Sequence, residues 1–472
     1  MIKPIIHMTT VAMCVSFMVG CVNRSEFKAP QTDVPAQWQH NKAIDSKRAI
    51  TSQWWTQLHD PKLNQLIKRT LNTNNDLILA ALTLKKARLN AGIDERALYP
   101  DVNSTTSAQR SKALDNGNSS TASYSTNLSL NYEIDLWSKL SRQSDASSWA
   151  AMASQEDLEA TAQSLVSTTA QLYWQVNYLH QRLELSKENI ASAKSTLKLA
   201  NSQYSHGAVS RLNVLEAKRN LAGLEATHSS FVQQFLEARN ALAVLFNQAP
   251  KAMSLPLKPL PTGELPKIHA GIPAQLLKRR PDVKSALYQL KSALASKDAT
   301  DGAFFPQLSL TGAIGGTSEQ LSNLLSNPIG TLGANLTLPF LNWNQMQLTR
   351  DISDVNYQTA VVNYRQTLYS AFEDVNNALS ARINLRIQQD KLQQQFNNAS
   401  EAESIYLSQY ENGAISITDL LDAQENARNA KAALLENRYN QLVNLATVYQ
   451  SLGGKDVLTD AEPLLSGENT SS

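Results

Sequence analysis

The chain has 472 residues, and its 43 lysines and arginines nearly balance its 41 aspartates and glutamates, which leaves a formal net charge of +2. This balance, without any block of basic residues, gives no basis for nucleic-acid binding. Both cysteines, Cys14 and Cys21, lie near the N-terminus, so the composition excludes a disulfide framework for the body of the protein.

The first 21 residues, MIKPIIHMTTVAMCVSFMVGC, have the layout of a secretory signal peptide: a short positive start, a mostly apolar stretch and small residues before Cys21. The last four of them resemble a bacterial lipobox, in which the cysteine is lipidated and becomes the mature N-terminus. We therefore expect a signal peptide at 1–20 and a covalent lipid such as palmitate on Cys21. The alternative is a plain signal peptide that happens to contain a cysteine. Residue 22 is Val and not Asp, and by the sorting rule for such lipoproteins this indicates the outer membrane.

The first half, residues 62–249, is expected to open with a helix at 62–97 that ends before a proline. A β-hairpin should follow at about 99–136. Residues 123–136 alternate apolar and polar side chains, which indicates a strand with two unlike faces, and a more polar strand is expected at 101–112. No later stretch has the ~18 uninterrupted apolar residues of a membrane-spanning helix, so any crossing by the mature chain should be made by strands.

A long helical hairpin is expected at 141–248. No proline or glycine interrupts Ser141 to Tyr204, which predicts a helix of roughly 95 Å. Gly207 then suits a helix C-cap, and a return helix should run from Ser210 to about Asn247.

The second half, residues 272–452, repeats this order. A helix is expected at 272–301 and a β-hairpin at about 304–341, with strands at 307–315 and 332–340. A long helical hairpin should follow at 345–452, broken at Gly413. The proline-rich segment 250–271 joins the halves as a linker, and 453–472 forms a C-terminal tail.

The two halves also share short sequence motifs. SQYSHGAVS at 202–210 returns 206 residues later as SQYENGAIS at 408–416, and Tyr99-Pro100 returns at the same offset as Phe305-Pro306. A period near 200 is too long for a solenoid repeat. We interpret it as an internal duplication that gives two structural repeats.

Four strands per chain are too few to close a membrane barrel. Bacterial barrels begin at about eight strands, and an open edge in lipid leaves backbone groups unsatisfied. Two chains are therefore the minimum, and three would give twelve strands. The alternative is a soluble antiparallel sheet packed on helices. Helices of this length also need neighbours along them, so we expect coiled-coil packing within and between chains.

Three long stretches carry a family resemblance: SQWWTQLHDPKLNQLI at 52–67, LLKRRPDVKSALYQLKSALASKDATDGAFFPQLSLTG at 276–312, and YENGAISITDLLDAQENARNAKAALLENRYNQLVNLATVYQSLGG at 410–454. The chain resembles the TolC-like outer-membrane efflux factors, in particular the lipoprotein branch, the NodT-type components of resistance-nodulation-division tripartite pumps. The resemblance implies an α+β membrane protein. A trimeric 12-stranded outer-membrane β-barrel would continue as a periplasmic α-helical coiled-coil barrel. Residues 21–61, 250–271 and 453–472 would form a mixed equatorial domain.

The implied function is a passive exit duct. It would carry drugs or other small toxic compounds from an inner-membrane pump and a periplasmic adaptor to the outside. The homotrimer, the adaptor, the pump and outer-membrane lipid would be its partners. The alternatives are a conduit for type I protein secretion and a non-conducting structural coiled-coil lipoprotein. The seven histidines show no metal-ligand spacing, and no catalytic or nucleotide-binding motif occurs, so we expect no enzyme, no metal and no cofactor besides the lipid.

The resemblance also implies a periplasmic gate, often closed in this family by rings of aspartate. Asp419 and Asp422 match those positions. Three copies of each near one axis would form a negative ring that favours cations. The alternative is that both are acidic residues at a helix start, where the helix dipole favours them. Asn213 and Glu216 are the weaker equivalents in the first half.

Tyr410 matches a tyrosine that takes part in a closing hydrogen bond in the family. The arginine of some members is missing from the second turn, where 415–417 read Ile-Ser-Ile, and Arg211 in the first turn is the nearest basic candidate. Gly207 and Gly413 would shape the two turns at the periplasmic tip, where a partner could bind.

Overall fold

The computed structural model describes residues 24–35, 38, 53–112, 114, 120–250, 257–268, 273, 279–453 and 457–460. The predicted signal peptide and Cys21 lie outside these ranges. The chain divides into two compact units, one drawn from 1–32, 82–156 and 284–367, the other from 33–81, 157–283 and 368–472. Within the described ranges, none of the helices has the length and apolar character needed to span a membrane.

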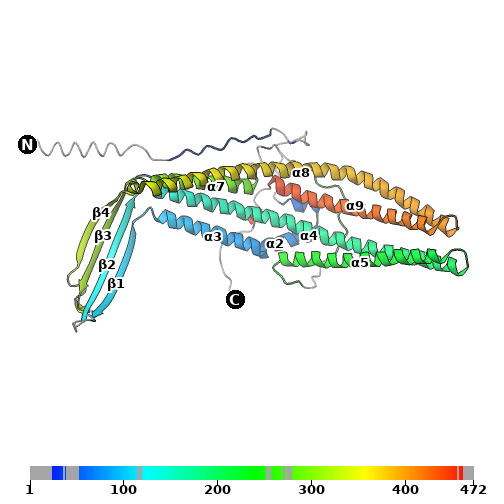
Figure 1. Ribbon diagram of the computed structural model, residues 1–472, viewed down its shortest axis with the longest axis horizontal. Helices are drawn as coiled ribbons and strands as arrows, with labels where there is room; N and C mark the ends of the chain where they lie inside the picture. Colours follow the sequence, from blue (N-terminus) through cyan, green and yellow to red (C-terminus); the bar gives the residue numbers. More distant parts are fainter. Residues whose placement is uncertain are drawn as a thin grey trace, which may run out of the picture. The chain divides into compact units, whose positions relative to one another are not determined.

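The first unit contains one antiparallel sheet of four strands in the order β1-β2-β3-β4 (Figure 1). Two hairpins far apart in the chain form it, because β2 pairs with β3. β1 and β4 are therefore its edges. The strands are β1 Asp101–Lys112, β2 Ser120–Ile134, β3 Gln307–Ser318 and β4 Ile329–Thr337.

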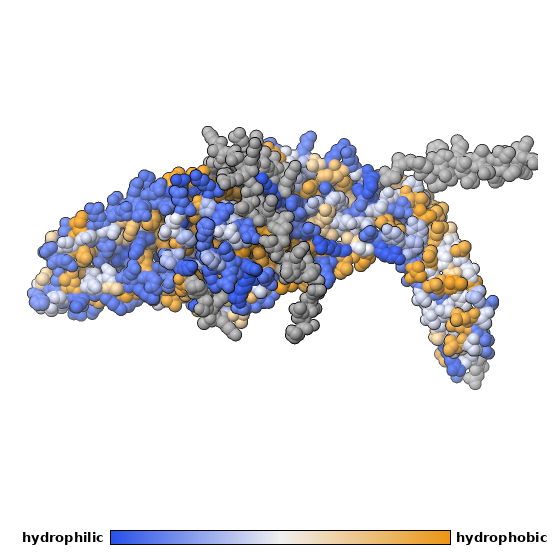
Figure 2. All heavy atoms as spheres, turned by 180° about the vertical axis from the view of Figure 1, so that it is seen from behind, coloured by the Kyte–Doolittle hydropathy of each residue, from blue (hydrophilic) through white to orange (hydrophobic). Residues whose placement is uncertain are grey.

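The register gives the sheet one apolar and one polar face. Leu130 lies opposite Val102 on one side and Gly312 on the other, and Gly312 lies opposite Leu332. The neighbouring row, which points to the other face, reads Asn103, Ser129, Ala313 and Thr331. Leu332 is 95% exposed, and Figure 2 shows hydrophobic residues at the surface along the strands. The alternation expected from the sequence is thus present in these two rows of paired residues.

Several predicted strand ends are wrong. β3 runs to Ser318 instead of 315, because residues 316–318 still pair with β2, and β4 begins at Ile329 instead of 332, because residues 329–331 pair with β3. β2 ends at Ile134 instead of 136, because the Asp135 carboxylate accepts the backbone N–H groups of Leu140 and Ser141, both at 2.9 Å, and so holds the start of the next helix. β4 ends at Thr337 instead of 340. Pro339 lacks the N–H group that a strand needs, and Pro339–Asn342 form a 3-10 helix.

The helix predicted at 62–97 is two helices, α2 Pro61–Thr73 and α3 Asn75–Arg96. Asn74 breaks it with an extended backbone. Its side-chain oxygen accepts the N–H groups of Asp76 and Leu77, at 2.8 and 3.3 Å, while its amide donates to the carbonyl of Leu245 at 3.0 Å. An asparagine side chain that satisfies a new helix start competes with continuation of the first helix.

Five further α-helices occur in the described part of the chain: α4 Lys139–Ser205, α5 Arg211–Leu245, α7 Pro281–Gly302, α8 Trp343–Glu411 and α9 Ile417–Leu452. With 67 and 69 residues, α4 and α8 are each roughly 100 Å long, close to their predicted extents. α7 begins at Pro281, and most of 269–278 lies outside the described residues, so the predicted start at 272 is untested. In the second unit, the short 3-10 helix Trp54–Leu58 packs Trp54 flat on Tyr449, with ring centroids 5.0 Å apart.

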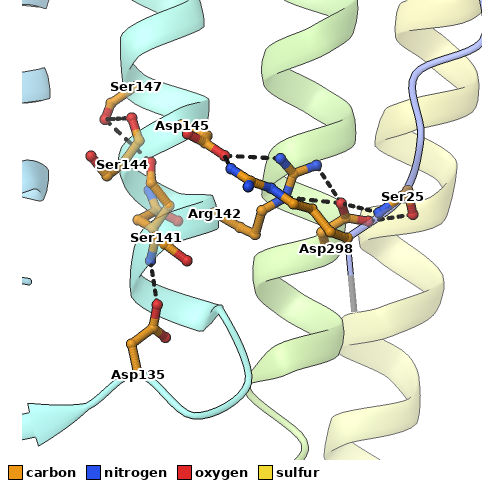
Figure 3. Close-up of polar contacts among 10 residues, drawn as sticks. Ser25, Asp135, Ser141, Arg142, Ser144, Asp145, Ser147 and Asp298 are labelled. Atoms are coloured by element: carbon orange, nitrogen blue, oxygen red, sulfur yellow. Dashed lines mark hydrogen bonds and ion pairs between the residues drawn. The ribbon is translucent and has the colours of Figure 1, made fainter. Parts of the chain in front are cut away.

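In the first unit, a polar cluster binds the segment that begins at residue 24 (Figure 3). We call it the N-terminal clamp: Arg24, Ser25, Arg142, Asp145 and Asp298. Ser25 donates its backbone N–H and its hydroxyl to Asp298, at 3.0 and 2.7 Å. Arg142 donates through Nε to Asp298 and through Nη1 to Asp145, both at 2.9 Å, and Arg24 reaches Asp145 at 3.0 Å. The Asp298 side chain is 1% exposed, so these donors compensate for the hydration that its charge loses on burial.

Asp298→Ala should destabilise the first unit by about 3–5 kcal/mol, because it leaves the buried Arg142 without its main partner. It should also release Ser25, which trypsin cleavage after the exposed Lys28 would report as faster cutting. Asp354→Ala is the matched control, since Asp354 pairs with Lys297 at the surface, where such a pair contributes less than about 1 kcal/mol. Equal cleavage rates in the two variants would contradict the clamp.

Candidate functional site

The two long helical hairpins end in turns with nearly the same backbone. Gly207 has φ 74° and Gly413 has φ 75°, both in the left-handed region. In each turn the glycine N–H and the following N–H bond back to the end of the helix; Ala208 and Ala414 do so at 2.9 Å. A Cβ on either glycine would meet no atom within 4 Å, so glycine is needed here for its backbone freedom and not for space. The structure thus places both predicted tip glycines at helix C-caps.

A small core joins the two turns. Tyr410 at the end of α8 is 1% exposed and packs into it. Gln203 of α4 reaches the Tyr410 carbonyl at 3.4 Å. The core therefore draws on α4, α5, α8 and α9, which fixes the two turns to each other. Its buried members are Ala200, Val214, Ala217, Tyr410, Ile417, Leu420 and Leu421.

The structure brings two predicted site residues together, Tyr410 and Asn213. Burial raises the pKa of Tyr410, and the nearby Asn213 amide offsets part of that rise. Asn213 nevertheless falls short of hydrogen-bond geometry, and the Tyr410 hydroxyl has no hydrogen-bond partner among the described residues. A buried hydroxyl without a partner is costly. The closing hydrogen bond implied for Tyr410 stays a prediction.

Asp419 caps α9. Its carboxylate accepts the backbone N–H of Ser416 at 3.1 Å and the Ser416 hydroxyl at 2.7 Å, and the Asp419 N–H returns to that hydroxyl at 3.3 Å. This is a capping box. Asp422, one turn further along, is exposed and has no hydrogen bond or ion pair with any described residue. The helix-start role of Asp419 is therefore observed, and the carboxylate of Asp422 faces solvent freely.

The first turn lacks this arrangement. Ser210 approaches Asn213 only at 3.5 Å and makes no side-chain cap to α5. Glu216 is held by Arg219, at 2.7 Å. Arg211 is exposed and unpaired within the described chain. One turn of the site is thus acidic and the other carries a free cation, and no group of potential metal ligands occurs in the described part of the molecule.

Two polar contacts between α4 and α9 escaped the sequence analysis. Gln424 donates to Thr196 at 3.2 Å in a buried position, and Lys431 pairs with Glu188 at 2.9 Å. Gln424 and Thr196 occupy core positions of helices that are otherwise apolar there, and a polar residue out of the helical pattern is the signal that could have found them. These bonds fix the relative position of the two hairpins below the turns.

Ser416→Ala should weaken the start of α9 by about 1 kcal/mol, because it removes both hydroxyl bonds of the capping box. Ser210→Ala at the equivalent place should change little, since Ser210 makes no cap bond. Hydrogen exchange at residues 417–420, compared with residues 211–214, measures the difference. Equal protection loss in both turns would contradict the asymmetry of the caps.

The comparisons agree with this architecture. The family model described as "Outer membrane efflux protein" matches residues 66–248 and 272–454. The antibiotic efflux pump outer membrane protein ArpC of Pseudomonas putida is 29% identical over 462 residues, 94% of this chain and 95% of its own length. The probable outer membrane lipoprotein SilC of Salmonella typhimurium is 27% identical over 93% of this chain and 96% of its own. The structure of the CmeC outer membrane channel of Campylobacter jejuni aligns with a TM-score of 0.82 and 27% identity, covering 94% of this chain and 98% of that one.

The matched segments include both hairpins of strands, both long helical hairpins and both turns. They span well over half of the chain. The chain belongs to the outer membrane efflux protein family.

Proposed function

We propose that three copies of this chain form the passive exit duct of a tripartite efflux system in the outer membrane. Their sheets would join into one 12-stranded barrel, and their helices would continue it into the periplasm as a coiled-coil tube. The duct would receive drugs or other small toxic compounds from an inner-membrane pump through a periplasmic adaptor. The relative named as an antibiotic efflux component supports this cargo class. The pump has to supply the energy, since the sequence has no nucleotide-binding motif.

The observation that carries this proposal is the four-stranded sheet with unlike faces. Within the described residues, β1 and β4 each pair along one side only. In lipid, the free N–H and C=O groups of an edge strand cost several kcal/mol each. Joining β4 of one copy to β1 of the next removes every edge, with the Leu332 row facing lipid and the Asn103 row facing a wet lumen.

The helices next to the edge strands support the same assembly. α3 leads into β1 and α8 follows β4. Each of these helices exposes an apolar stripe at coiled-coil spacing. A contiguous exposed apolar face of this kind marks a surface that contacts another chain. Closing the sheet edges would bring the α8 stripe of one copy toward the α3 stripe of the next. The stripes are Leu82, Leu89 and Ile93 on α3, 55%, 61% and 67% exposed, and Leu348, Ile352, Val355 and Val362 on α8, 58–65% exposed.

Lipidation of Cys21 remains part of the proposal, since Cys21 lies outside the described residues. The lipobox and the relative named as an outer membrane lipoprotein support it. In the trimer, the three copies of Asp422 and the three copies of Asp419 would lie close together at the tip. Tyr410 and Arg211 would contribute to closing this gate. A negative ring of this kind would bind cations and restrict flow at rest.

The detergent-extracted protein should have the mass of three chains, measured by light scattering corrected for detergent. Ile352→Asp should shift it toward monomer, because a charge would lie in the apolar stripe. Thr349→Asp places the same charge on an exposed position of α8 outside that stripe, and should leave the trimer intact. A monomeric wild type would leave the sheet edges open and favour a non-conducting structural lipoprotein.

Asp419→Ala combined with Asp422→Ala should raise single-channel conductance in planar bilayers at neutral pH and weaken block by divalent cations. Glu216→Ala should change conductance less, because Glu216 is already paired with Arg219. Unchanged current and block in the double variant would reduce both aspartates to helix-start residues. Passage of a protein through the duct, in place of small molecules, would instead identify a secretion conduit.

A further inference from the structure

A cavity of about 550 Å³ lies in the second unit, away from the turns. One wall is the segment 257–268 of the proline-rich linker, which we call the linker strap, and the others are α8 and α9. Its charged lining is uneven, with four cations facing two carboxylates. The cations are Lys267, Arg382, Arg386 and Arg438, and the carboxylates are Glu264 and Asp390.

Two of these arginines bind the linker strap through neutral acceptors. Arg438 donates to the carbonyls of Pro261 and Gly263, the latter at 2.6 Å, and to the side-chain oxygen of Gln441 at 3.2 Å. Arg382 donates through Nη2 to the carbonyl of Pro266 at 2.6 Å. Its Nη1 is buried and has no acceptor in the described part of the chain. The hydrogen bonds therefore hold the strap but leave the positive charges unmatched.

None of the four cations forms an ion pair with a carboxylate of the described chain, although Glu264 and Asp390 line the same cavity. Burial lowers the pKa of Arg382 and of Arg438, and Arg386 lowers that of Arg382 further. Half-buried guanidinium groups usually lie beside a carboxylate, which compensates for the hydration that they lose on burial. Among the described residues, no carboxylate supplies that counter-charge to Arg382 or Arg438.

We propose that the cavity under the linker strap binds a small multivalent oxyanion, one that carries carboxylate or phosphate groups. Guanidinium groups bind such groups through paired, charge-assisted hydrogen bonds. The volume lies within the range of small-molecule sites. The excess of two cations over carboxylates matches a divalent anion. The site differs from the tip and does not depend on the duct function, because all of its residues lie within one unit of a single chain.

An anion in this cavity would join the linker strap to α8 and α9 through its own charge. Occupancy would therefore stabilise the strap against the helices. Arg386 and Lys267 are the best residues for a test, since neither makes a hydrogen bond to another described residue, and their loss should leave the fold intact.

The test is isothermal titration of the detergent-extracted full-length protein with citrate and, separately, with inorganic phosphate, at fixed ionic strength in sodium chloride. Saturable binding of about one anion per chain is expected. Arg386→Gln and Lys267→Gln should each weaken it about tenfold, the effect of losing one charge-assisted hydrogen bond. Binding of citrate alone would identify carboxylates as the ligand groups, and binding of phosphate alone would identify phosphates.

Arg428→Gln is the matched control. Arg428 is also a half-buried arginine of α9 whose pKa burial lowers, but it lies outside the cavity. Its variant should bind the anion as the wild type does. Two results would overturn the proposal: no saturable binding to the wild type, or equal weakening in Arg428→Gln and Arg386→Gln, which would indicate attraction by the general field of the protein.

Discussion

The fold depends on one requirement, that every backbone N–H and C=O group of the sheet finds a partner. β2 and β3 satisfy it within the chain by pairing with each other across the two halves. β1 and β4 do not, because each has one free side in the described chain. α3 leads into β1 and α8 follows β4, and each of these two helices exposes an apolar stripe. The assembly that we propose would satisfy these open edges and bring the exposed stripes together.

The two turns show how a duplicated hairpin can acquire two chemistries. Their glycines have the same backbone angles and their helix ends the same hydrogen bonds. The difference lies three residues after the capping serine, where one turn has Asp419 and the other Asn213. The aspartate closes a capping box and brings negative charge to the turn, whereas the asparagine leaves the cap open and instead lies near the buried Tyr410. The Asp419 carboxylate thus stabilises a helix start and also adds negative charge to the surface beside it.

The sequence predicted the element order, the strand at 101–112 and both long helices nearly to their ends, because proline, glycine and strict alternation act locally. It missed the break at Asn74, because the capping bonds of its side chain to Asp76 and Leu77 do not disturb the apolar pattern, and the bond that orients that side chain goes to Leu245, 171 residues away. It placed the ends of β2 and β4 too late, because a capping carboxylate and a proline outweighed hydrophobic alternation that continued past them. It placed Gly207 and Gly413 correctly in the two turns, whereas the gate role of Asp419 and Asp422 stays a prediction. The burial of Tyr410 against α5 and the polar bonds of Gln424 depend on contacts between helices, which periodicity in one segment does not specify.

The N-terminal clamp has a mechanical consequence. In the lipidated protein that we propose, only Val22 and Asn23 separate Cys21 from Arg24, so the chain between these two residues can span at most about 10 Å. Any pull that the bilayer exerts on an acyl chain would pass along this short segment to Ser25 and then to Asp298 on α7 and Arg142 in the first turn of α4. Those two helices lie directly beside β3 and β2 in the chain. The load would therefore reach the two inner strands of the sheet through a buried ion pair.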